Sequence, residues 1–275
     1  MDHKQYGGVS AKDVIVFQTK IMMGTQFGRI IWAREHKSED LGNSRDEILI
    51  ACLRMGWNDA FRHTSQNESG INDERSGAAG SGGKKDKYMR PRFKRFRGII
   101  KEEPTPQAFD DYYSNRVISD PKFLDIFKTY AKTAVDKHTV IDSEWETIKD
   151  CFRGVKKLDG QKRLSLGHIQ KMFNIAVKLY LCLYICREEL GLRDLFIQEI
   201  VDNFANADCP VDSIILGELE QIEMEKRKEG AAFKSVFGQY IWSQLNAADY
   251  EAIQKKVHSE SKGNSNLWFD FAHWN

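Results

Sequence analysis

The chain has 275 residues, 29% of them charged, and a formal net charge of +1, which is the composition of a globular protein rather than of a disordered one. Hydrophobic residues make up 41% and include 16 Phe, 9 Tyr and 6 Trp, enough for a substantial core. No run of about 18 apolar residues occurs, and the first residues lack the apolar segment of a signal peptide. We therefore expect a cytoplasmic protein with no membrane contact.

The five cysteines lack the C-x-x-C spacing of metal or redox sites, and they are typical of thiols that pack as small apolar groups in a reducing compartment. No histidines stand at the spacing of a zinc finger. The sequence predicts no cofactor and no metal site, and no motif indicates an oligomeric state.

Helical periodicity dominates the chain, and neither an alternating strand pattern nor an internal repeat occurs. In the N-terminal region, residues 1–63, a first helix is predicted over 10–37. A second helix is predicted to open at Ser44, whose spacing to Glu47 is that of a capping box, and to end near His63. Later helices are predicted over 121–137, 143–153 (opened by a capping box at Ser143 and Glu146), 164–189, 192–204, 212–228, 247–258 and, with a strand as the alternative, 231–245.

These elements predict an all-α fold, an irregular multi-helix domain whose central buried helix lies near 164–189. Residues 64–103 differ in composition from the rest of the chain and separate the N-terminal helices from the C-terminal helical region. Residues 64–87 are polar and glycine-rich, as in a mobile loop or linker. Residues 104–275 form the C-terminal helical region, which could belong to one domain with residues 1–63.

The segment from Lys84 to Lys101, here called the basic arm, concentrates positive charge. It holds nine basic residues and one acidic residue, a local charge of +8, so the rest of the chain carries −7 against the total of +1. Aromatic rings stand among these charges. Arginine forks bind phosphates and rings stack on unpaired bases, as in proteins that bind single strands. The residues expected to make these contacts are Arg90, Arg92, Phe93, Lys94, Arg95, Phe96 and Arg97.

The basic arm predicts a non-enzymatic, nucleic-acid-associated helical protein whose partner is single-stranded or structured nucleic acid. Two alternatives stay open. The arm could be a solvated segment whose charges pair with the acidic remainder, or it could dock onto an acidic protein partner within a bacterial multi-gene system. Membrane attachment is disfavoured because the long apolar face that it needs is missing.

The helix predicted over 164–189 is apolar around nearly its whole circumference, as in helices buried inside a domain. Four polar residues interrupt it at a spacing that places them on one face, namely Gln170, Lys171, Asn174 and Lys178. Burying two ammonium groups without partners is strongly unfavourable. We therefore expect a solvent-facing edge, internal ion pairs with Asp208 or Asp212 as the acids, or a bound anion.

This helix also resembles part of an uncharacterised bacterial protein family. That family has a G-x-x-Q-K-x-x-N-x-x-x-K-Y helix, a later P-x-D turn and an ending of aromatic, acidic and Trp residues. The matching residues are Gly167, Gln170, Lys171, Asn174, Lys178, Pro210, Asp212, Phe269, Phe271 and Trp274. Leu179 stands where the family has Tyr, and the resemblance covers about the last 110 residues. It implies a bacterial protein in which Lys171, Asn174, Lys178 and Asp212 act as one cluster, and it implies no known activity.

Two nuclease alternatives rest on short patterns. The spacing of Arg163 and His168 resembles the R-x4-6-H motif of HEPN-like ribonucleases, helical enzymes that cleave RNA with an Arg and a His, although Leu164 replaces the polar residue common in that motif. The alternative for both residues is an exposed first helical turn. Asp142, Glu144 and Glu146 are similar to the paired acids of Mg²⁺ nucleases, with an acidic helix start as the alternative.

Overall fold

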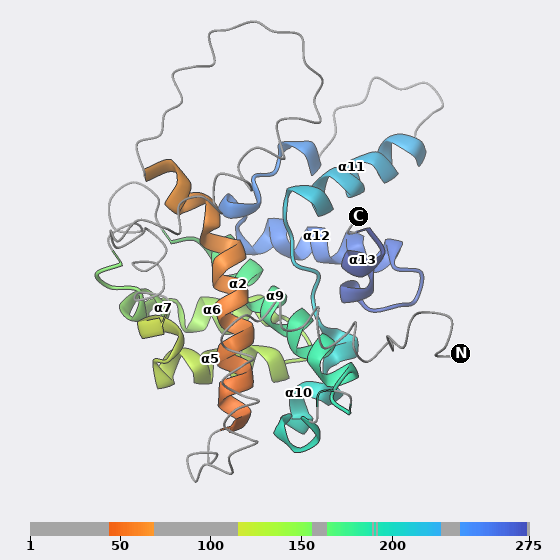
Figure 1. Cartoon of the computed structure of the whole chain (residues 1–275). Helices are drawn as coiled ribbons and strands as arrows, with labels where there is room; N and C mark the ends of the chain where they lie inside the picture. The colour runs from red at the N-terminus through yellow and green to blue at the C-terminus, as the bar shows by residue number, and fades with distance from the viewer. Residues whose placement is uncertain are drawn as a thin grey trace, which may run out of the picture.

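The computed structural model describes residues 44–68, 115–155, 164–188, 190, 192–226 and 237–273 (Figure 1). These residues fold into helices and contain no strand, which confirms the all-α class. The α-helices are α2 (Ser44–Glu68), α5 (Pro121–Lys132), α6 (Lys137–Ser143), α7 (Trp145–Cys151), α9 (Leu166–Ile185), α10 (Gln198–Asp202), α11 (Ser213–Lys226), α12 (Ala247–Glu260) and α13 (Asn266–His273). The 3-10 turns are η4 (Arg193–Leu195), η5 (Phe204–Asn206), η6 (Phe237–Gln239) and η7 (Trp242–Gln244). Within these ranges no helix combines the length and the apolar character needed to cross a bilayer.

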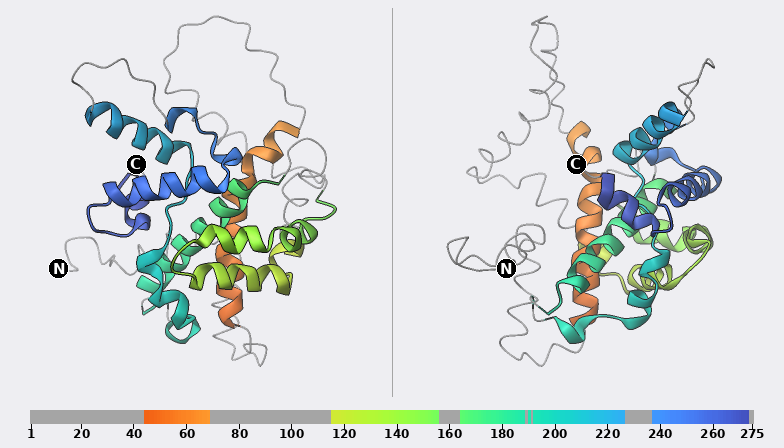
Figure 2. Two further views of the ribbon diagram at one scale, coloured as in Figure 1. Left: turned by 180° about the vertical axis from the view of Figure 1, so that it is seen from behind. Right: turned by 90° about the vertical axis from the view of Figure 1, so that its right-hand side faces the viewer.

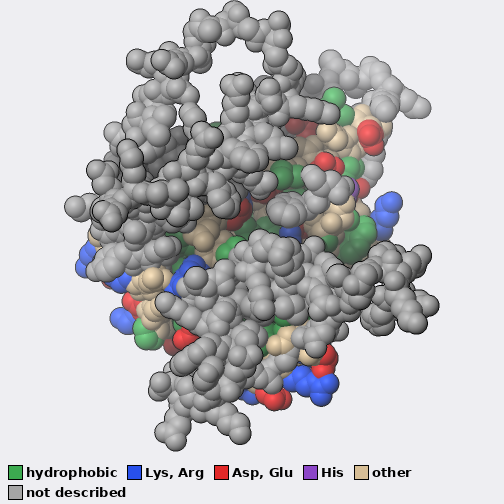
Figure 3. All heavy atoms as spheres, viewed as in Figure 1, with side chains coloured by type: hydrophobic (Ala, Val, Ile, Leu, Met, Phe, Trp, Pro, Cys, Tyr) green, Lys and Arg blue, Asp and Glu red, His purple; other side chains and the backbone are tan. Residues whose placement is uncertain are grey.

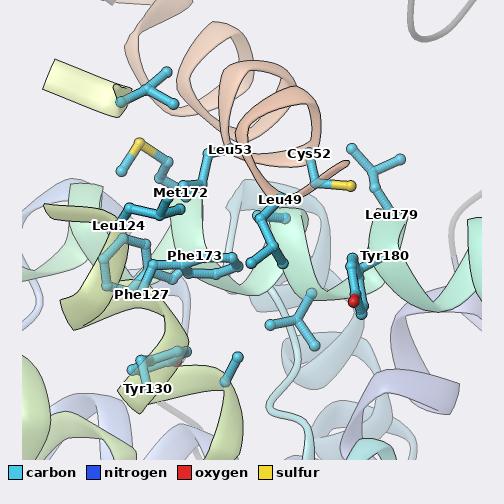
Figure 4. Packing of buried hydrophobic residues seen from close by; sticks show 14 of the residues in the cluster. Leu49, Cys52, Leu53, Leu124, Phe127, Tyr130, Met172, Phe173, Leu179 and Tyr180 are labelled. Carbon is cyan, nitrogen blue, oxygen red and sulfur yellow. The ribbon is translucent and has the colours of Figure 1, made fainter. Parts of the chain in front are cut away.

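Helix α9 is the centre of the fold, and α2 lies along one side of it (Figures 1 and 2). The two backbones touch at Gly56, where a Cβ atom would clash with the carbonyl oxygen of Met172 and would lie 3.2 Å from its Cγ. Figure 4 shows Leu49 and Leu53 of α2 pointing towards Met172 and Phe173 of α9. A glycine on α2 thus permits the close approach that buries this apolar seam.

The buried side chains form two clusters. The larger joins α2, α5, α7 and α9 and is rich in aromatic contacts, such as Trp57 stacked on Phe152 with ring centroids 5.2 Å apart. The smaller joins α11, α12 and α13 through residues that include Ile215, Ile253 and Phe269. Figure 2 shows α11, α12 and α13 grouped together. We call these the first core and the second core.

Two predicted boundaries between 121 and 153 are wrong. The helix predicted over 121–137 ends at Lys132, and the buried Lys137 turns back to donate from Nζ to the carbonyl of Thr133 at 2.6 Å. Ser143 does not open a helix. It ends α6 and donates from Oγ to the carbonyl of Val140 at 3.1 Å, and α7 begins at Trp145 without a side-chain cap.

The predicted helix over 192–204 is broken into η4, α10 and η5. The break at Ile197 is stabilised from outside the segment, because the Tyr180 hydroxyl accepts the backbone N–H of Ile197 at 2.7 Å. The described part of 231–245 forms the turns η6 and η7 rather than a regular helix, and α13 was not predicted. Helix α2 runs past His63 to Glu68. The helix predicted over 10–37, most of the glycine-rich linker and the basic arm lie outside the described residues.

The five cysteines are free thiols. Cys52 and Cys209 are fully buried, each in one of the two cores. Burial also raises the pKa of Cys151 to about 11. Cys52 and Cys209 therefore act as packing groups, and Cys151 carries little thiolate near neutral pH.

Candidate functional site

The polar face of α9 lies between the two cores, and both of its lysines are paired with acids. Lys171 Nζ lies 2.9 Å from Asp59 Oδ2 of α2 and 4.4 Å from the ring centroid of Trp242. Lys178 forms an ion pair with Asp270 of α13 and lies 4.9 Å from the centroid of the Phe271 ring. The expectation that Asp208 or Asp212 pairs with these lysines is therefore wrong.

Asp212 has a different task, since it accepts the backbone N–H groups of Ile214 and Ile215 at 2.9 and 3.0 Å and so caps the start of α11. Gln170 lies on the polar face of α9 but adds no polar contact to it. It is 1% exposed, and neither side-chain amide atom has a hydrogen-bond partner in the part of the chain that the structure describes.

Asn174 links the two cores through a buried chain of hydrogen bonds. The Tyr130 hydroxyl of α5 donates to Asn174 Oδ1 at 2.6 Å, and Asn174 Nδ2 donates to the hydroxyl of Tyr250 on α12. The Tyr250 hydroxyl donates in turn to Asp208 Oδ2 at 3.2 Å. Gln254 completes this seam by accepting the N–H of Cys209 at 3.0 Å and donating to its carbonyl at 2.7 Å.

The hydrogen-bond chain ends at a pocket of about 310 Å³ between the loop before α6 and helix α12. Asp208 and Lys137 both line this pocket. Burial raises the pKa of Asp208 to about 6, although Lys137 and the Tyr250 hydrogen bond lower it. Burial lowers the pKa of Lys137 to about 8, although the charge of Asp208 raises it. The pKa values of both groups are thus shifted towards neutrality. Titratable groups with such shifts are common in functional pockets.

The raised pKa of Asp208 gives a test by stability. The folded value, about 6, lies above the ordinary 3.8, so folding favours the protonated carboxyl. The protonated Asp208 carboxyl therefore adds to the free energy of unfolding. This contribution is fully present below about pH 4 and is lost as the pH rises through about 6. Asp208→Asn keeps the acceptor for Tyr250 and removes the charge, so the variant should melt a few degrees higher than the wild type at about pH 7 and at a similar temperature at about pH 4. A variant that melts lower at about pH 7 would show that the ionised carboxylate stabilises the fold.

The structure describes His168 of the Arg–His pattern and the three acids of the acidic pattern. His168 is 7% exposed and stacks on Phe61 with ring centroids 5.3 Å apart, and its Nδ1 lies 2.5 Å from Ser165 Oγ. The expectation of an exposed first turn is wrong for this histidine, because its ring is covered by Phe61 and by Trp242. Arg163 lies outside the described residues.

The acidic pattern falls on the junction between α6 and α7. Asp142 and Glu146 are exposed, and Glu146 Oε1 lies 2.5 Å from Lys149 Nζ. Over the described ranges, no three His, Cys, Asp or Glu side chains are grouped so that they could hold a metal ion.

Sequence reasoning missed Asp59 and Tyr130 at this seam, because neither stands in a motif. It also did not identify Asp270, the acid between Phe269 and Phe271 in the C-terminal pattern, as a partner of α9. Comparison of the chain with protein-family models, with curated proteins and with solved structures gave no match.

Proposed function

We propose that the protein is a bacterial nucleic-acid-associated protein that binds single strands through its basic arm without cleaving them. The observation that carries the proposal is the charge separation, +8 within Lys84–Lys101 and −7 elsewhere. A segment of this charge neutralises phosphates and releases counterions whatever the base sequence. The aromatic rings within it supply stacking surfaces for unpaired bases.

The residues that the structure describes leave the basic arm as the stronger candidate for the nucleic-acid contact. The lysines of the α9 face, which were the other candidates for an anion site, are engaged by Asp59 and Asp270. On the face shown in Figure 3, basic and acidic side chains of the described residues lie interspersed along the lower edge. Interspersed charges give a weak net field for a polyanion compared with a segment of +8.

The first test removes charge from the basic arm. A variant with Arg92, Lys94, Arg95 and Arg97 replaced by Gln should bind single-stranded DNA and RNA more weakly. The slope of log affinity against log salt concentration should become shallower by up to about 3, because each phosphate contact on a single strand contributes about 0.7 to the slope. Fluorescence anisotropy over a range of salt concentrations measures both quantities.

A matched control loses the same four charges from the helical part, with Lys122, Lys132, Lys149 and Arg153 replaced by Gln. These side chains are exposed, on α5, on α7 and in the turn that follows α7. The control variant should keep the wild-type slope. Equal losses in both variants, or identical curves for the wild type and the arm variant, would contradict the proposal. Recovery of a single acidic protein with the chain and no nucleic acid would favour a protein partner instead.

A second variant separates stacking from charge. Phe93→Ala with Phe96→Ala should weaken binding by about 1–3 kcal/mol for each base that loses its ring and should leave the salt slope unchanged. An unchanged affinity at low salt would show that the rings do not contact bases. A changed salt slope would show that the substitutions disturb the phosphate contacts.

A further inference from the structure

The pocket beside Asp208 holds a buried lysine, Lys137, and a partly buried carboxylate, Asp208, which form no salt bridge with each other. Lys137 is 4% exposed, and Nζ donates to the backbone carbonyls of Thr133 at 2.6 Å and Tyr130 at 3.4 Å. Asp208 accepts the Tyr250 hydroxyl. Across the described residues neither Lys137 nor Asp208 takes part in a salt bridge, although each shifts the pKa of the other.

Both groups have unused hydrogen-bonding capacity, and both line the pocket. An ammonium group has three N–H donors, of which Lys137 uses two on the end of α5. A carboxylate offers about four acceptor positions, and a described side chain fills one of them on Asp208. The lining of the pocket therefore includes one positive donor and one negative acceptor, together with the apolar side chains of Ala134 and Val135.

We propose that this pocket binds a small zwitterion of the amino-acid class, with its ammonium group against Asp208 and its carboxylate against Lys137. A zwitterion is the class of ligand that satisfies both charges, because an anion satisfies Lys137 alone and a cation satisfies Asp208 alone. Unpaired buried charges are strongly unfavourable, so pairing both at once is the main source of affinity. The volume of about 310 Å³ lies at the lower end of the range for ligand pockets.

The rest of the pocket disfavours phosphorylated ligands. The charged and titratable groups around the pair are Asp136 and His138 next to Lys137, Tyr130 from α5, and Glu251, Lys255 and His258 on α12. Glu251 Oε1 and Lys255 Nζ pair with each other at 2.5 Å at the mouth. Asp136 then leaves the pocket slightly negative, which repels a phosphate and tolerates a molecule with no net charge.

The pH dependence of binding follows from the same two groups. Asp208 must be ionised, which requires a pH above about 6, and Lys137 must be protonated, which requires a pH below about 8. Affinity should therefore be greatest between these values and should fall on either side.

The experiment uses the full chain and the free L-amino acids, one at a time, as probes in thermal melts and then in calorimetry. At least one should raise the melting temperature at about pH 7. Its N-acetyl derivative lacks the cation and its amide lacks the anion, so each should bind about ten- to a hundredfold more weakly. These derivatives test the wild-type protein and do not depend on the folding of a variant.

Two variants test the pocket. Asp208→Asn and Lys137→Met should each weaken binding about ten- to a hundredfold, with folding checked by circular dichroism. Lys149→Gln, an exposed lysine on α7 that does not line the pocket, is the matched control and should bind like the wild type. The variant neutralised in the basic arm should also bind normally, so failure of one proposal is distinguishable from failure of the other.

Three results would overturn the inference. They are no melting shift with any amino acid, equal binding of the amino acid and its blocked derivatives, and binding of free nucleosides at this pocket in place of amino acids.

Discussion

Lys178→Met should lower the free energy of unfolding by about 3–5 kcal/mol, the usual loss when one partner of a buried ion pair is removed. Asp270 is 3% exposed and pairs with Lys178 across the seam between the two cores. Methionine keeps the stem of Lys178 and removes its charge, so the carboxylate is left buried beside other acids. Urea denaturation at about pH 7 measures the change.

Two controls isolate the ion pair. Lys149→Met removes the partner of Glu146, but both side chains are largely exposed, so the loss should stay below about 1 kcal/mol. Burial already raises the pKa of Asp270, and Lys178 lowers it. Without Lys178 the carboxyl should hold its proton to higher pH, so the deficit should shrink as the pH falls. If the loss in free energy of unfolding were the same at acidic pH, it would come from altered packing and not from the unpaired carboxylate.

Gly56→Ala should also destabilise the fold, by about 2–3 kcal/mol, since the added methyl group overpacks a close contact. The new Cβ would meet the backbone carbonyl of Met172, which cannot rotate away, so α2 and α9 must separate along the seam that joins them. The readouts are the denaturation midpoint and the melting temperature.

Gly217→Ala is the matched control on α11. A Cβ there would have no heavy atom within 4 Å. Alanine is the better helix former, so this variant should gain about 0.5–1 kcal/mol. If Gly56→Ala were as harmless as Gly217→Ala, the close approach of the two helices would be wrong.

Hydrophobic periodicity predicted those helices whose buried residues and caps lie close together in the sequence. Helix α9 was expected over 164–189 and runs over Leu166–Ile185, because its apolar residues and its cap at Ser165 are neighbours in the chain. The break after Lys132 was missed, since it depends on Lys137 reaching back to the helix end. The short turns between 193 and 206 were missed for the same kind of reason, a contact from Tyr180.

The candidate site was predictable only on its α9 side. Spacing places Lys171, Asn174 and Lys178 on one face, and burial requires that they have partners. Which acids serve as partners depends on how distant helices pack, and Asp59 and Asp270 come from opposite ends of the described chain. The pocket could not be predicted from sequence spacing at all, because it forms only when α12 packs beside the start of α6.

The contact between α2 and α9 has a consequence for how the chain folds as it is made. Gly56 and Met172 are 116 positions apart (172 − 56). At about 5–20 residues per second, roughly 6–23 s pass between the synthesis of the two residues. During that time the apolar side of α2, with Leu49, Leu53 and Trp57, has no α9 to cover it. Exposed apolar surface of this kind makes a nascent chain prone to aggregation until the segment that covers it has been made.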